Sequence, residues 1–285
     1  ATVTRLPTAK APPGPPATPA LDRRRLIAFM SMVFGMFMAI LDIQIVSSSL
    51  SEIQAGISAS ADEIPWVQTS YLVAEVVMIP LSGFLGRMVS TRYLFAASAA
   101  GFTLMSVMCA QASSIEEMII WRALQGFIGG GMIPSVFSAA FTIFPREKQS
   151  IVSPIIGLVA TLAPTIGPTA GGYLTDLFSW HWLFLVNVIP GIGVTLAAWF
   201  LIDFDKPNFA LFKSFDWWGL AGMAAMLGGL EYVLEEGTAK DWFQDERIVW
   251  CAITAAIGGT LFFFRAFTAL TPIVDLKAFS NRNFA

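Results

Sequence analysis

The sequence predicts an all-α, polytopic membrane protein with about eight transmembrane helices. Of its 285 residues, 55% are hydrophobic and 13% charged, and the mean hydropathy of +0.67 lies outside the range of soluble domains. Runs of about 20 apolar residues, enough for a helix to cross a hydrocarbon core of about 30 Å, recur along the chain. The net charge of −3 gives a nucleic-acid partner no electrostatic support.

The region 1–25 is predicted to be a disordered tail. It holds six prolines before Leu21 and ends in three consecutive arginines, a composition that cannot bury a core. The apolar run that follows is too long for the core of a signal peptide. We therefore expect the transmembrane part to begin at Leu26. The expected spans are Leu26–Ser48, Ile64–Leu85, Tyr93–Ala112, Met118–Phe144, Ile151–Thr175, Trp182–Ile202, Trp217–Leu234 and Ile248–Phe267.

The basic residues predict the orientation of these spans. Of the 17 lysines and arginines, fourteen lie in the tail, the last segment and alternate connectors, whereas only two lie in the opposite connectors. Lys and Arg in short loops mark the cytoplasmic side, and the opposite connectors carry mostly acids. Both ends of the chain are therefore expected in the cytoplasm, which agrees with an even number of spans.

Three acids and one base lie inside the expected spans: Asp42, Glu75, Glu231 and Arg122. A charge at the bilayer centre costs about 2.5–3.5 kcal/mol, so each needs a partner, a water-filled cavity or neutralisation. Asp42 and Arg122 lie at similar depth and could pair, or Arg122 could reach the interface and leave Asp42 to water or a helix end. Glu75 lies near the middle of the second expected span. It could carry protons, recognise cations or be a hydrogen-bonded structural acid. We expect Glu231 to be interfacial.

Motifs of several enzyme classes are missing from the sequence. It contains no HExxH, GxSxG or P-loop lysine motif and no clustered Cys and His ligands, so we expect no enzyme activity, metal or other cofactor. An intramembrane aspartyl hydrolase would need two converging acids, and Asp42 with Glu75 matches that pattern only weakly.

The stretch Leu158–Leu174 places helix breakers inside an apolar run. In lipid, such residues are tolerated where neighbouring helices cover the bend. Four small residues recur at helical steps and predict one flat face for close helix packing, or simply a kinked packing helix: Ala160, Pro164, Gly167 and Gly171.

Several motifs resemble those of the major facilitator superfamily, and within it the fourteen-helix EmrB/QacA-type drug–proton antiporters. "RALQG" resembles the fourth-helix motif, which contributes Arg122, Gln125 and Gly126, and "LDIQIV" the first-helix motif, which contributes Asp42. "WHWLFLVNVIPG" resembles the start of the sixth helix. "GPTAGG" resembles the antiporter motif of the fifth helix, whose residues here are Pro164, Gly167, Pro168, Gly171 and Gly172.

The cytoplasmic loop motif departs from the family pattern. "GFLGRMVSTR", Gly83 to Arg92, has Arg87 where an acid usually stands and Ser90 where a glycine usually stands. The resemblance implies that Gly83, Arg87 and Arg92 form this motif, without the acid on which the family's gate is usually built.

The resemblance implies a six-helix transporter domain over 26–202, two additional helices over 203–270, and the cytoplasmic start of a second half over 271–285. The chain is accordingly expected to be part of a longer protein of the bacterial inner membrane. Asp42, Arg122 and Glu75 would couple protons to the export of drugs or toxic amphipathic compounds, and the antiporter motif would seal against the other half. A periplasmic adaptor and an outer-membrane channel would be partners. Export of one natural product such as a siderophore, or a membrane sensor or scaffold without flux, are the alternatives.

Overall fold

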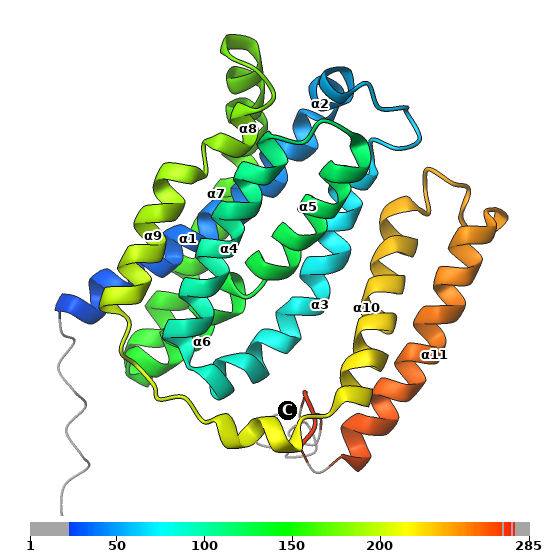
Figure 1. Ribbon diagram of the computed structural model, residues 1–285. Helices are drawn as coiled ribbons and strands as arrows, with labels where there is room; N and C mark the ends of the chain where they lie inside the picture. Colours follow the sequence, from blue (N-terminus) through cyan, green and yellow to red (C-terminus); the bar gives the residue numbers. More distant parts are fainter. Residues whose placement is uncertain (1–22, 270, 275, 277–285) are drawn as a thin grey trace, which may run out of the picture.

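The computed structural model describes residues 23–269, 271–274 and 276, with the side chains of Arg146 and Glu147 left aside (Figure 1). The tail before Arg23 and most of the expected segment 271–285 lie outside the described residues. Within the described part all regular structure is helical, which confirms the all-α prediction. Seven helical segments there are long and apolar enough to cross a membrane.

The first six expected spans form one bundle. Its first helix begins three residues earlier than expected, so the arginines at its start belong to its first turn. A short helix, α2 (Leu50–Ile57), follows α1 and was not expected. The other helices of the bundle are α1 (Arg23–Ser48), α3 (Trp66–Val89), α4 (Thr91–Ala110), α5 (Ile115–Gly129), α6 (Met132–Ile143), α7 (Arg146–Leu177), α8 (Trp182–Leu185) and α9 (Val188–Leu201).

Two of the expected spans are each broken into two helices. The fourth is interrupted at Gly130 and Gly131, between α5 and α6. The sixth is interrupted at Val186 and Asn187, between α8 and α9. Pro190 explains the second break, because proline has no N–H to donate to the carbonyl of Val186 four residues earlier. Backbone turns inside apolar segments are tolerated where protein covers them.

The two additional helices form a pair beside the bundle. α10 (Trp217–Glu236) packs against α3, and α11 (Glu246–Thr268) packs against α10 (Figure 1). Short 3₁₀ helices, η1 (Phe209–Ser214) and η2 (Trp242–Gln244), lie in the connections before α10 and before α11. α10 was expected to be a span but is not among the seven apolar segments, since four glycines, two tryptophans and Glu231 lower its hydropathy.

Two apolar clusters follow one another along α1. The first includes Met32, Met36 and Ala39 of α1, and the second includes Ile45 and Val46. Both are filled by side chains of the surrounding helices, because α1 packs against α6, α7 and α9. The clusters leave one layer of α1 between them, and this layer holds the candidate site.

Candidate functional site

A fully buried ion pair occupies the layer between the two apolar clusters. Arg122 Nη1 of α5 lies 2.7 Å from Asp42 Oδ2 of α1, and both side chains are 0% exposed. The two residues therefore pair, as one of the sequence interpretations held, and Arg122 does not extend to the interface. A buried pair is held by its mutual attraction, and removal of one partner leaves an uncompensated charge.

Arg122 makes further contacts with α3 and with its own helix. Its Nε donates to the carbonyl oxygen of Val67 at 3.2 Å, and its Nη1 donates to Gln125 Oε1 at 2.8 Å. The guanidinium carbon lies 4.2 Å from the ring centroid of Tyr71, a cation–π contact. One nitrogen, Nη2, has no hydrogen-bond partner among the described residues, so the arginine retains an unused donor there.

Asn187 holds the second oxygen of Asp42. Its Nδ2 donates to Asp42 Oδ1 at 2.7 Å and also lies 3.2 Å from Ser106 Oγ, which donates to the carbonyl of Phe184 at 2.9 Å. The break between α8 and α9 places Asn187 in this layer. Asn187 lies within the motif at the start of the sixth helix, but no role was predicted for it from the sequence. The signal available was an amide side chain inside an apolar span.

Glu75 does not join this hydrogen-bonded pair. It is 7% exposed, and its Oε1 has no hydrogen-bond partner among the described residues. It lies one helical turn from Tyr71 on α3. The structure thus brings Asp42, Arg122 and Gln125 together and places Glu75 nearby as a separate buried carboxyl.

Gly126 explains how α5 approaches α3 closely enough to build this layer. A Cβ atom at Gly126 would lie 2.3 Å from the backbone oxygen of Tyr71, and one at Gly130 would lie 3.1 Å from that of Glu75. Only glycine allows the first of these approaches. The "Q-G" pair of the fourth-helix motif therefore provides one hydrogen-bonding side chain and one point of backbone contact.

The antiporter-motif residues of α7 differ in burial. Gly167 and Gly171 are buried against α1: their Cβ atoms would lie 2.4 Å from Gln44 Cβ and 2.7 Å from Ser48 Oγ. The close approach of these two glycines in this structure is to α1, a helix of the same bundle. Pro164 and Pro168 are exposed, and a Cβ at Gly172 would meet nothing within 4 Å.

The cytoplasmic loop motif contains strained backbone, and a carboxylate from the connection after α9 accepts hydrogen bonds from it. Ser90, between α3 and α4, has φ 82° and ψ 155°, a conformation that favours glycine. Asp205, from the connection after α9, accepts from the Thr91 amide at 2.9 Å and from its hydroxyl at 2.9 Å. Arg87 is exposed and donates to the Gly83 carbonyl at 3.2 Å. The guanidinium carbon of Arg92 lies 5.3 Å from the centroid of the Trp199 ring.

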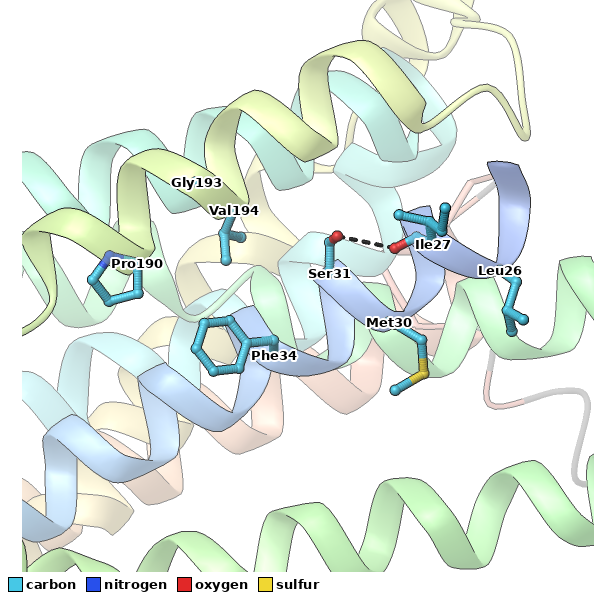
Figure 2. Close-up of a pocket in the computed structure, with 8 residues that line it drawn as sticks. All are labelled: Leu26, Ile27, Met30, Ser31, Phe34, Pro190, Gly193 and Val194. Carbon is cyan, nitrogen blue, oxygen red and sulfur yellow. Dashed lines mark hydrogen bonds between the residues drawn. The ribbon is translucent and has the colours of Figure 1, made fainter. Parts of the chain in front are cut away.

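A separate apolar groove lies between α1 and α9 (Figure 2). Its volume is about 520 Å³, and Ser31, its one hydroxyl-bearing residue, donates to the Ile27 carbonyl at 2.9 Å. Among the residues that the structure describes, its lining includes no charged side chain and no member of the Asp42 layer. The lining residues are Leu26, Ile27, Met30, Ser31, Phe34, Pro190, Gly193 and Val194.

Comparison with solved structures shows the fold. The human organic anion transporter MFSD10 matches with a TM-score of 0.55 and 14% identity over 83% of this chain and 70% of its own. A bacterial homolog of the human lysosomal transporter Spinster, inward-facing and unoccupied, matches with a TM-score of 0.51 and 14% identity over 93% of this chain and 64% of its own.

Comparison with curated proteins gives closer sequence matches. The chain is 48% identical to the colistin resistance protein EmrB of Acinetobacter baumannii over 90% of this chain and 50% of that protein. It is 30% identical to the multidrug export protein EmrB of Escherichia coli K12, over 91% of this chain and 50% of that protein. It is 32% identical to the fatty acid resistance protein FarB of Neisseria gonorrhoeae, again over 50% of that protein. The chain spans about half the length of these relatives.

The family model of the major facilitator superfamily matches residues 32–284, almost the whole of the chain. The match begins inside α1 and includes all later helices of the bundle and the additional pair. The apolar helices, the transporter-like fold and this match agree, and the chain is a multi-pass membrane protein that belongs to the major facilitator superfamily.

Proposed function

We propose that the chain forms the N-terminal half of a secondary active exporter, which expels drugs or other toxic amphipathic compounds in exchange for protons by alternating access. The observation that carries the proposal is the fully buried pair of Asp42 and Arg122. Ionisable residues within a membrane domain are costly and mark ion or proton pathways by default.

The arrangement around Asp42 suits reversible protonation. A proton on the carboxylate would remove the negative charge that Arg122 faces at 2.7 Å, and Arg122 would remain buried with less compensation. Its unused Nη2 and the unpartnered Oε1 of Glu75 are groups that a rearranged layer could bring together. We therefore assign proton coupling to Asp42 and Arg122, with Glu75 as a second carboxyl that takes up or passes on the proton.

The exposed side of α7 suits contact with a second half. Pro164 and Pro168 lie there beside Gly157 and Gly172, at each of which a Cβ would meet nothing within 4 Å. Small residues let two helices approach closely in a membrane. We assign this side, rather than Gly167 and Gly171, to the seal that opens and closes as two halves rock against each other.

The relatives' names support a broad range of small-molecule substrates. They refer to multidrug export, colistin resistance and fatty acid resistance. The chain contains 12 methionines and 24 phenylalanines, and such adaptable side chains suit poorly selective binding. We place the protein in the bacterial inner membrane with its N-terminus in the cytoplasm, and propose a periplasmic adaptor and an outer-membrane channel as partners. We assign no catalytic residue.

The test is proton-driven efflux from vesicles that contain the full-length protein. A fluorescent lipophilic cation is loaded, a proton gradient is imposed, and release is followed for the wild type, Asp42→Asn, Glu75→Gln and Arg122→Ala. We expect gradient-driven release to be lost in Asp42→Asn and Arg122→Ala and reduced in Glu75→Gln. Glu52→Gln, which changes an exposed acid of α2, is the matched control and should behave as the wild type.

The outcomes separate the alternatives. Release that an uncoupler does not affect would contradict proton antiport while it leaves transport in place. Release of a single natural product, with no release of unrelated compounds, would indicate a dedicated exporter. Absence of flux for every compound, in a correctly inserted full-length protein, would favour a sensor or scaffold.

A further inference from the structure

A second groove lies where the additional pair of helices meets the bundle, away from the Asp42 layer. It is formed by α3, α10 and α11 and has a volume of about 630 Å³, within the range of about 300–1,000 Å³ that small-molecule sites occupy. Its lining includes Trp66 and Val73 of α3, Gly228 and Tyr232 of α10, and Trp250 of α11.

The two ends of this groove differ in chemistry. Toward the middle of the helices the lining is small and apolar, and Gly228 packs against α3 with its Cβ position 3.4 Å from Val73. Toward the α10–α11 turn the lining becomes aromatic: Trp66 stacks on Tyr232 with ring centroids 5.2 Å apart, and Trp250 lies at the edge, 60% exposed. Trp and Tyr gather where membrane meets water, so this end lies at headgroup level.

The aromatic end also carries charges of both signs. Arg247, in the first turn of α11, lines the groove and is exposed. Asp245 caps α11 by accepting from the Arg247 amide at 2.7 Å, and Glu246 accepts from Trp250 Nε1 at 3.2 Å. The Tyr232 hydroxyl is a further polar group at this end, and within the described part of the chain it has no hydrogen-bond partner although the residue is only 5% exposed. Arg247 and Tyr232 thus line the aromatic end of the groove, and the Asp245 and Glu246 carboxylates each contact a residue of that lining.

We propose that this groove binds one phospholipid whose headgroup is a zwitterion with a primary ammonium, as in phosphatidylethanolamine. Its phosphate accepts from the Arg247 guanidinium, its ammonium donates to the Asp245 and Glu246 carboxylates, and one acyl chain lies along Gly228 and Val73. Charge complementarity selects this headgroup. A purely anionic headgroup would face two carboxylates, and a trimethylated ammonium has no hydrogen to donate to them.

The proposal does not depend on export, and it is tested by lipid binding to the full-length protein. The protein is purified in mild detergent and exposed to equal amounts of phosphatidylethanolamine, phosphatidylcholine and phosphatidylglycerol, and the lipids that it retains are counted by native mass spectrometry. We expect preferential retention of phosphatidylethanolamine.

Two matched substitutions on α11 locate the site. Thr254→Phe places a large ring in the groove, whereas Thr260→Phe places the same ring outside it. The two threonines are equivalent in other respects, because both are exposed and each donates to the carbonyl four residues earlier, at 2.8 and 2.9 Å. We expect Thr254→Phe to lower the affinity for phosphatidylethanolamine about tenfold, which corresponds to about 1.4 kcal/mol, and Thr260→Phe to leave it unchanged.

Two further variants test the headgroup contacts. Arg247→Gln should weaken retention of all three lipids, since it removes the donor to the phosphate. Glu246→Gln together with Asp245→Asn should abolish the preference over phosphatidylcholine, and asparagine preserves the helix cap. The proposal is overturned if the wild type retains no lipid, or if Thr254→Phe and Thr260→Phe retain it equally. It is also overturned if an export substrate displaces the bound lipid from the wild type but does not displace it from Thr254→Phe. A protein that fails to export still gives a lipid measurement, so failure of the two proposals is distinguishable.

Discussion

The side-chain amide of Asn187 donates to Asp42 Oδ1 over 2.7 Å, and it does so from the point where the sixth span breaks. Asp42 is thereby held between two donors, with Arg122 on one oxygen and Asn187 on the other.

Asn187→Leu should destabilise the protein even though it makes the span more apolar. The carboxylate of Asp42 would lose one of its donors, and hydrogen bonds to charged groups contribute about 1.5–3 kcal/mol. The measurement is the thermal unfolding of the purified full-length protein. Asn208→Leu, at an exposed position outside the bundle's interior, is the control, and an equal effect of the two would contradict this role.

The Asp42–Arg122 pair should show strong coupling in a double-mutant cycle. Asp42→Asn or Arg122→Met alone leaves one buried charge unpaired, at a cost of about 3–5 kcal/mol. The double variant leaves neither charge in the interior. We therefore expect its loss of stability to be smaller than the sum of the losses in the two single variants. Unfolding midpoints of the four proteins supply the cycle. Additive effects would mean that the two charges do not depend on each other.

Two glycines of α7 should respond to alanine with opposite signs. In a helix interior, Gly→Ala normally stabilises by about 1 kcal/mol. Gly157→Ala should show this gain, since its Cβ would meet nothing within 4 Å. Gly167→Ala should instead destabilise, because its Cβ would lie 2.4 Å from Gln44 Cβ. Size-exclusion profiles after heating distinguish the two, and a gain in both would show that α7 can move away from α1.

Ser90→Gly should stabilise the connection between α3 and α4. At φ 82° and ψ 155° a serine is held in a region used almost only by glycine, at a cost of about 1–3 kcal/mol. The unfolding midpoint of the variant should therefore rise. Ser113→Gly, at a position before α5 without positive φ, should not raise it. An unchanged midpoint in Ser90→Gly would show that the strain is relieved in solution.

Asp205→Ala should destabilise the start of α4. Its carboxylate accepts from the Thr91 amide and hydroxyl, and loss of such a cap costs about 1 kcal/mol. Asp203→Ala, an exposed acid two residues earlier in the same connection, is the matched control. Hydrogen exchange of the first α4 amides is the readout, and equal exchange in the two variants would show that the cap is dispensable.

The sequence predicted the helices, and offered the central pair as one of two interpretations, because both depend on the cost of polarity in lipid. A run such as Trp66–Val89 can be read as a span from its composition, and Asp42 and Arg122 stand out as charges that need a partner. Asn187 was missed because an amide costs less than a charge in the same environment, and only the break between α8 and α9 shows where its side chain lies. The short helix α2 was missed for a related reason, since eight residues are too few to show a periodic pattern.

The glycines of α7 show a different limit of sequence reasoning. A stripe of small residues predicts that another helix backbone comes close, but it does not indicate which helix. Gly167 and Gly171 were assigned to the other half, whereas they contact α1. The spacing of the residues could not distinguish α1 from a helix of the other half, because close packing against either helix requires glycine at the same positions.

The buried ion pair and its hydrogen-bonded neighbours are drawn from α1, α3, α4, α5 and the α8–α9 segment, all within one bundle. Among the described residues, the contacts of this layer thus all come from one bundle. Substitutions that reshape a drug-contacting surface in a second half would leave its geometry intact, so substrate range and energy coupling can diverge separately as such proteins evolve.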